Sequence, residues 1–161
     1  MKVRLSKEMA ATWVYNWDPE YPYDLLYQDM YDCTHIDDDA AAEFAKATYK
    51  YAGVDFSDSH GQLLLGCKYG NASHPEIETL SDTSALHLAK MPGALELTSL
   101  AQLTDTGAKH LSKMRVADHG DDVVQPSPGL YIILEKLPES AAKILRDAGH
   151  SSVPCVEEDN F

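Results

Sequence analysis

The sequence predicts a single α/β domain, built as a short and irregular stack of strand–helix units with an atypical N-terminal part. Three observations predict this fold. The chain has 161 residues, the length of one compact domain. Hydrophobic residues make up 44% of it and charged residues 24%, which is the composition of a folded protein. Its middle contains an internal repeat, the mark of a stacked architecture.

The repeat consists of two similar segments that lie 23 residues apart. Residues 80–91 read LSDTSALHLAKM and residues 103–114 read LTDTGAKHLSKM, with eight of twelve positions identical. Two weaker copies fit the same frame at 36–46 and 137–145, at irregular spacing. The region 61–150 is therefore predicted to be repeat-like.

Each copy is predicted to begin a helix. A leading apolar residue is followed by polar and acidic residues, which cap free N–H groups and suit the positive end of the helix dipole. An alanine then precedes a large apolar residue by three positions, a spacing that places both on one inward helical face. These pairs are Ala41 and Phe44, Ala85 and Leu88, Ala108 and Leu111, and Ala142 and Leu145.

The segment between the two best copies predicts a strand. Leu95 and Leu97 alternate with polar residues, and Leu100 and Leu103 continue the apolar side. A unit of strand, turn and helix with this pattern, LxLxxLxxLSxxxAxxLA, resembles those of bacterial leucine-rich-repeat-like proteins. The resemblance covers 77–114 well and 129–149 more weakly. It implies a binding protein rather than an enzyme.

The array departs from a regular one. One period before Leu95 and Leu97 the chain has Ala72 and His74, and 115–128 is predicted to be an inserted acidic loop. Residues 1–60 are predicted to form an acidic, aromatic N-terminal part or cap, and 151–161 an acidic tail. The alternative is an irregular α+β single domain in which a duplicated segment survives.

The charge of the chain excludes some function classes. Lys and Arg number 13 against 26 acids, for a net charge of −13, which disfavours direct binding of nucleic acid or anionic lipid and favours a basic protein surface. The sequence shows neither a signal peptide nor a long apolar span, so a cytoplasmic protein without contact to membrane is expected. The three cysteines are far apart and are expected to be reduced.

The N-terminal part holds the predicted partner-binding residues. Seven aromatic residues fall between Trp13 and Tyr31, and no lysine or arginine lies between Asp18 and Asp39. Tyrosines are enriched at interface hot spots, and carboxylates steer a basic partner. The alternative is that two series spaced four residues apart form the core faces of helices near a cap, with the acids solvated. These series are Trp13 and Trp17, and Tyr23, Tyr27 and Tyr31. The candidate residues are Tyr23, Tyr27, Asp29, Asp32, Asp37, Asp38 and Asp39.

No catalytic, cofactor-binding or metal-binding residue is predicted. His87 and His110 share a repeat position, which indicates repeated packing. No nucleophile or phosphate-binding motif occurs. The function expected is a non-enzymatic interaction module for a protein with a basic surface. A sharper variant of this hypothesis is a phage-type or immunity-type inhibitor that mimics nucleic acid. The alternative is a hydrolase or transferase that uses a cluster of Asp118, His119, Asp121 and Asp122.

Overall fold

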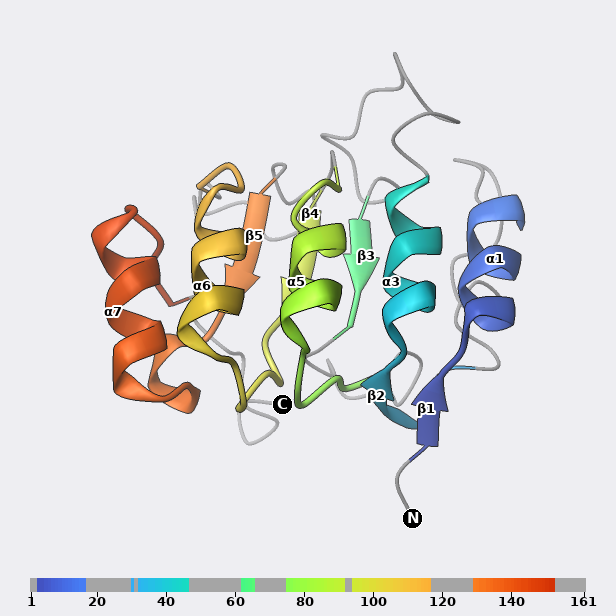
Figure 1. Ribbon diagram of the computed structural model, residues 1–161, viewed down its shortest axis with the longest axis horizontal. Coiled ribbons are helices and arrows are strands. Elements are labelled where there is room, and N and C mark those ends of the chain that lie inside the picture. Colours follow the sequence, from blue (N-terminus) through green and yellow to red (C-terminus); the bar gives the residue numbers. More distant parts are fainter. Residues whose placement is uncertain are drawn as a thin grey trace, which may run out of the picture.

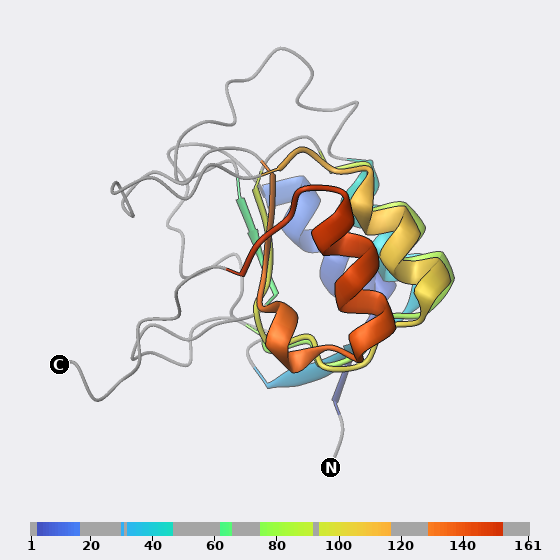
Figure 2. The same cartoon turned by 90° about the vertical axis from the view of Figure 1, so that its left-hand side faces the viewer.

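The computed structural model describes residues 3–16, 30, 32–46, 62–65, 75–91, 94–116 and 129–152. Within these ranges strands and helices alternate along the chain, and every strand pair is parallel. The helices lie side by side in one row, and all of them cover the same side of the strands (Figures 1 and 2). The predicted α/β class is confirmed.

The elements follow the order expected for stacked strand–helix units. They are β1 (Val3–Leu5), α1 (Lys7–Asn16), β2 (Cys33–Ile36), α3 (Asp38–Ala45), β3 (Gln62–Leu64), α5 (Asp82–Leu88), β4 (Ala94–Leu97), α6 (Asp105–Ser112), β5 (Gly129–Ile132), the 3₁₀ helix η2 (Leu134–Lys136) and α7 (Glu139–Asp147). Neighbouring helices in this row pack against each other from α1 to α7.

The strands form two parallel ladders. In one, β3, β4 and β5 pair so that Leu63, Leu95 and Leu130 lie opposite one another. In the other, β1 pairs with β2. This second ladder continues beyond β2, because the Cys33 carbonyl accepts a hydrogen bond from the Glu76 N–H at 3.2 Å. Parallel backbone pairing therefore occurs in both the first and the last unit of the stack.

The core consists of repeated columns that run across the units. A small alanine lets each helix approach the strands, and a large apolar side chain one turn later fills the space that remains. The alanine column is Ala10, Ala41, Ala85, Ala108 and Ala142, each at most 1% exposed. The large column is Trp13, Phe44, Leu88, Leu111 and Leu145, all buried. The inward helical face predicted from the sequence is confirmed in all four copies.

The structure adds a first copy that the sequence did not reveal. Leu5 pairs in register with Ile36, and Ala10 and Trp13 follow it at the intervals found in the other units. Trp13 is 3% exposed and packs edge-on against Phe44, with ring centroids 5.4 Å apart. The core interpretation of Trp13 is therefore correct, and α1 is a stacked helix of the array.

The array departs from a regular one where the sequence indicates. β3 (Gln62–Leu64) is the described strand that precedes α5, and Ala72 and His74 lie outside the described residues. At the start of the predicted loop, Val116 bridges to Leu130, and the Arg115 carbonyl accepts the Leu130 N–H at 3.2 Å. The rest of the predicted loop, 117–128, lies outside the described residues.

The last helix ends in a left-handed turn. Gly149 has φ of 100° and donates its N–H to the Arg146 carbonyl at 3.0 Å, while His150 donates to the Leu145 carbonyl at 3.1 Å. This pair of bonds is a Schellman motif, which satisfies carbonyls that the helix leaves without partners. The His150 side chain is 2% exposed, and its Nε2 lies 3.2 Å from the Ser112 carbonyl of α6. The turn thus ties α7 to its neighbour.

Replacing Gly149 by alanine is expected to lower the free energy of unfolding by about 1 kcal/mol, because a side chain disfavours positive φ. Space is not the cause, since an added Cβ would meet Val116 only at 3.5 Å. Gly149→Asn is the control and should cost less, as asparagine tolerates this conformation better. Urea unfolding checks both variants. An unchanged midpoint for Gly149→Ala would contradict the conformational explanation.

Candidate interaction surface

The N-termini of the helices share one edge of the molecule. The helices run in parallel, so the residues that begin them lie in a row (Figure 1). Each of the four later helices has an acid in its first turn. We call this row the acidic edge; it consists of Asp37, Asp38, Asp39, Asp82, Asp105 and Glu139. All of these residues are exposed except Asp37, which is half-buried.

The repeat builds the start of two of these helices in the same way. Ser81 precedes α5 and accepts a hydrogen bond from the Ser84 N–H at 3.0 Å through its Oγ. Thr104 precedes α6 and accepts from the Gly107 N–H at 3.0 Å. These side chains satisfy amide groups at the first turn that have no partner inside the helix. The predicted capping role of both positions is confirmed.

A ladder of carboxylates and hydroxyls joins successive helix starts. Asp38 of α3 accepts hydrogen bonds from the hydroxyls of Ser81 and Ser84, the latter at 2.8 Å. Asp82 of α5 accepts in the same way from Thr104 of the next unit. We call this series of contacts the carboxylate–hydroxyl ladder. The first acid of one helix therefore orients the cap of the next.

The final joint of the ladder uses a different residue. Pro138 occupies the cap position of α7 and has no hydroxyl to donate. Ser140, two residues later, donates instead to Asp105 Oδ1 at 2.7 Å. The first joint also differs, because Asp37 accepts from the Arg4 guanidinium at 2.5 Å. The acidic edge is thus held in place from the first unit to the last.

The ladder changes the acidity of Asp38. Hydrogen bonds from Ser81 and then Ser84 stabilise its ionised form and lower the pKa of this carboxyl below its ordinary value. The burial of Asp38 acts in the opposite direction but is the smaller influence. Asp38 is consequently ionised at neutral pH, and its negative charge belongs to the exposed edge.

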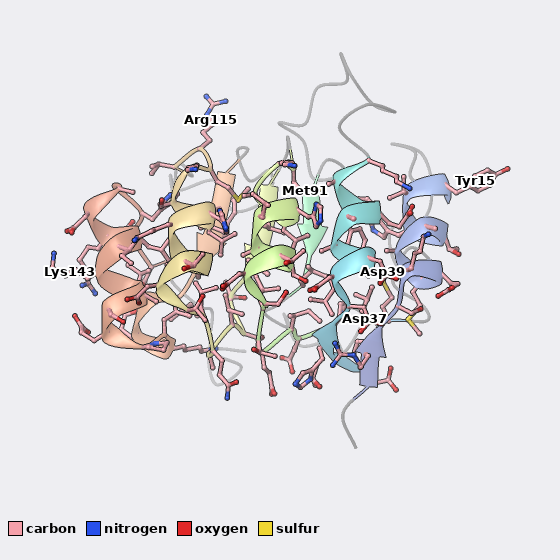
Figure 3. The ribbon with its side chains drawn as sticks, viewed as in Figure 1. Tyr15, Asp37, Asp39, Met91, Arg115 and Lys143 are labelled. Carbon is pink, nitrogen blue, oxygen red and sulfur yellow. The ribbon has the colours of Figure 1, made fainter. Side chains whose placement is uncertain are left out.

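The predicted partner-binding residues fall into four groups. Asp37 and Asp38 lie on the acidic edge but take part in the internal contacts described above. Asp39 lies beside them, exposed and without a hydrogen bond to any residue that the structure describes (Figure 3). Asp32 is exposed just before β2. Tyr23, Tyr27 and Asp29 lie outside the described residues.

Sequence reasoning missed half of this edge. Asp82, Asp105 and Glu139 each lie two residues after the leading apolar residue of their units, as Asp38 lies two residues after Ile36. Their common position in the repeat was the signal that places them on one edge. Asp82 and Asp105 occupy equivalent positions 23 residues apart, and each begins its helix.

The remaining candidate groups form no reactive centre in the part of the chain that the structure covers. His87 and His110 are half-buried at equivalent positions of α5 and α6. No three His, Cys, Asp or Glu side chains among the described residues lie close enough together to bind a metal ion. No described helix is both long and apolar enough to cross a membrane. The cluster of Asp118, His119, Asp121 and Asp122 lies outside the described residues.

Cys33 is a buried, free thiol of the core. It is 1% exposed at the start of β2. Burial, and then the negative charge of Asp32, raise the pKa of this thiol to about 11. Because the thiolate is the reactive form, Cys33 is poorly suited to act as a nucleophile at neutral pH.

Comparison of the chain with models of protein families, with curated proteins and with solved structures finds no match.

Replacing Asp38 by asparagine is expected to lower the free energy of unfolding by about 1 kcal/mol at pH 7, as a charge-assisted hydrogen bond is lost from a site close to solvent. The pKa of Asp38 is lowered in the folded state, so its ionised form stabilises the fold above the pKa of the unfolded chain, about 3.9. This contribution disappears as the pH falls through the folded pKa.

The difference between the wild type and Asp38→Asn should therefore be constant above about pH 5 and shrink below about pH 4. Urea unfolding across this range measures it. Asp39→Asn is the matched control from the same helical turn, and its effect should be smaller. A difference for Asp38→Asn that persists unchanged at low pH would show that the carboxylate contributes nothing through its charge.

Cys33 is expected to react with iodoacetamide at pH 8 at least about 100-fold more slowly in the folded chain than in urea, because a raised pKa leaves little thiolate. Peptide mapping by mass spectrometry separates its labelling from that of the other two cysteines. Equal rates in the folded and unfolded chain would place Cys33 at the surface and contradict the core assignment.

Proposed function

We propose that the chain is a cytoplasmic, non-enzymatic interaction module whose acidic edge binds a protein with a basic surface. The observation that carries this proposal is the row of exposed carboxylates at the start of four parallel helices. A binding role also agrees with the resemblance of the repeat to leucine-rich-repeat-like units, although a fold alone does not establish a function.

The magnitude of the charges supports a negative potential at this edge. The N-terminus of a helix carries a partial charge of about +0.5, whereas each ionised carboxylate carries a full negative charge. One carboxylate per helix therefore outweighs the dipole at that end. At α3 three acids are adjacent, and Arg4 offsets only one of them. The edge remains acidic along its length.

Pre-organisation adds to the suitability of this edge for binding. The carboxylate–hydroxyl ladder fixes Asp38, Asp82 and Asp105 in their conformations before any partner arrives. A partner that meets fixed charges pays less conformational entropy than one that must order mobile side chains. Lysine and arginine residues at the helix spacing, about 10 Å, would match this row.

The identity of the partner separates a general interaction module from an inhibitor that mimics nucleic acid. An inhibitor that occupies a nucleic-acid channel binds through many ion pairs, so salt weakens its binding steeply and DNA or RNA displaces it. A general module keeps its partner at higher salt through apolar contacts. Pull-down from the native host at low and high salt, with and without added nucleic acid, distinguishes the two.

Charge reversal of Asp39 tests the acidic edge with the captured partner. Asp39→Lys should weaken binding by about tenfold and reduce its dependence on salt, because a favourable charge becomes a repulsive one at the interface. Asp39 is the best position because its side chain is exposed and forms no hydrogen bond or ion pair with a described residue. Binding is measured by calorimetry over a range of salt concentrations.

The matched control is Asp147→Lys, which changes the net charge equally at the opposite end of α7. The affinity of Asp147→Lys for the partner should stay within about twofold of the wild type. Salt screens the interaction between the new charge and a partner bound at the distant acidic edge. Circular dichroism confirms that both variants are folded. Equal weakening by the two variants would indicate that only the total charge matters, and would contradict a defined acidic edge.

A further inference from the structure

A basic surface lies at the opposite end of the same helices. Six of the 13 lysines and arginines of the chain are exposed within or directly after the C-terminal halves of α5, α6 and α7. We call this surface the basic patch; it consists of Lys90, Lys109, Lys113, Arg115, Lys143 and Arg146. Figure 3 shows Arg115 pointing away from the fold beyond the end of α6, and Lys143 on the outer side of α7. Asp147, also exposed, lies among them.

The centre of the patch is electrostatically unsatisfied within the described part of the chain. Lys143 pairs with Asp147 at 2.8 Å, and Arg146 lies 3.6 Å from Glu139. By contrast, Lys109, Lys113 and Arg115 make no ion pair or side-chain hydrogen bond with any described residue. Three cations without an ion pair to any described residue therefore lie within seven positions of the chain.

Compensation of helix dipoles explains only part of this charge. The C-terminus of a helix carries about −0.5 of a charge, which a single cation in the last turn offsets. The described end of α3 carries one cation, Lys46. The second half of α6 and the three residues after it carry Lys109, Lys113 and Arg115, which is several times the charge that the α6 dipole requires. Among the described residues, an excess of positive charge remains at this surface.

We propose that the basic patch binds an acidic segment of a protein partner. A short acidic peptide contacts the patch within the screening distance of about 8 Å at physiological salt, so it experiences the local charges more than the distant ones. A nucleic acid is a long, densely charged polyanion, which the net charge of −13 repels along its length. The acidic segment is thus the polyanion that fits this surface.

This inference goes beyond the proposed function and uses different residues. The binding role of the basic patch can therefore be tested independently of that of the acidic edge. The acidic edge lies at the starts of the helices, whereas the centre of the basic patch lies in and beyond the second half of α6 (Figure 1). At α7 the two surfaces meet, because Arg146 lies 3.6 Å from Glu139. The chain would then bridge two surfaces of opposite charge.

The test measures binding of an oligoglutamate peptide to the full chain at 0.1 M salt, where screening acts over about 10 Å. The variant Lys109→Gln/Lys113→Gln/Arg115→Gln removes three positive charges at exposed positions. It should bind the peptide about tenfold more weakly than the wild type, as several exposed ion pairs are lost together. NMR chemical shifts should change at α6 in the wild type.

The control variant is Lys7→Glu/Thr83→Glu, which alters the net charge by the same amount at the other end of the helices. It should keep the affinity for the peptide, and circular dichroism verifies that both variants are folded. Equal weakening in the two variants, or no binding of the peptide to the wild type, overturns the proposal. Tighter binding of a short DNA duplex than of the peptide, lost in the triple variant, overturns it in favour of a nucleic acid.

Discussion

The architecture depends on one constraint, which is that no unit can bury the inward face of its own helix. Each helix is only two or three turns long, and its apolar residues are covered by the strands beneath and by the helices on either side. The alanine column makes this possible, because a larger side chain at Ala41, Ala85 or Ala108 would hold a helix away from the strands. Parallel helices, a common edge and aligned dipoles all follow from this stacking.

The sequence predicted those parts of the fold that repeat. Leu80 and Leu103 head nearly identical segments, and their helices begin where the pattern indicates. The first copy escaped notice because Trp13 replaces the usual leucine. The strand at Gln62–Leu64 escaped because residues 66–74 separate it from the rest of its unit. For the acidic edge, the sequence indicated Asp37, Asp38 and Asp39, but not that Asp38 meets Ser81, since stacking alone brings together residues 43 positions apart.

The net charge of the chain conceals how its charges are arranged. A total of −13 suggests a uniformly acidic surface, yet α5, α6 and α7 carry acids in their first turns and basic residues in their last turns. An acid at the start and a basic residue at the end each stabilise a single helix, because they complement its dipole. Parallel stacking then turns a local preference into two opposed surfaces, and the sign of the charge that a partner meets depends on the end it approaches.

The carboxylate–hydroxyl ladder has a consequence for how such an array changes in length. A unit such as 80–102 contains both halves of a joint, the hydroxyl of Ser81 that meets the preceding acid and Asp82 that meets the following cap. Tandem duplication of its coding segment would therefore supply a complete joint at each new boundary without any compensating mutation. Pro138 breaks this rule in the last helix, so growth by copying would favour the interior of the array over its end.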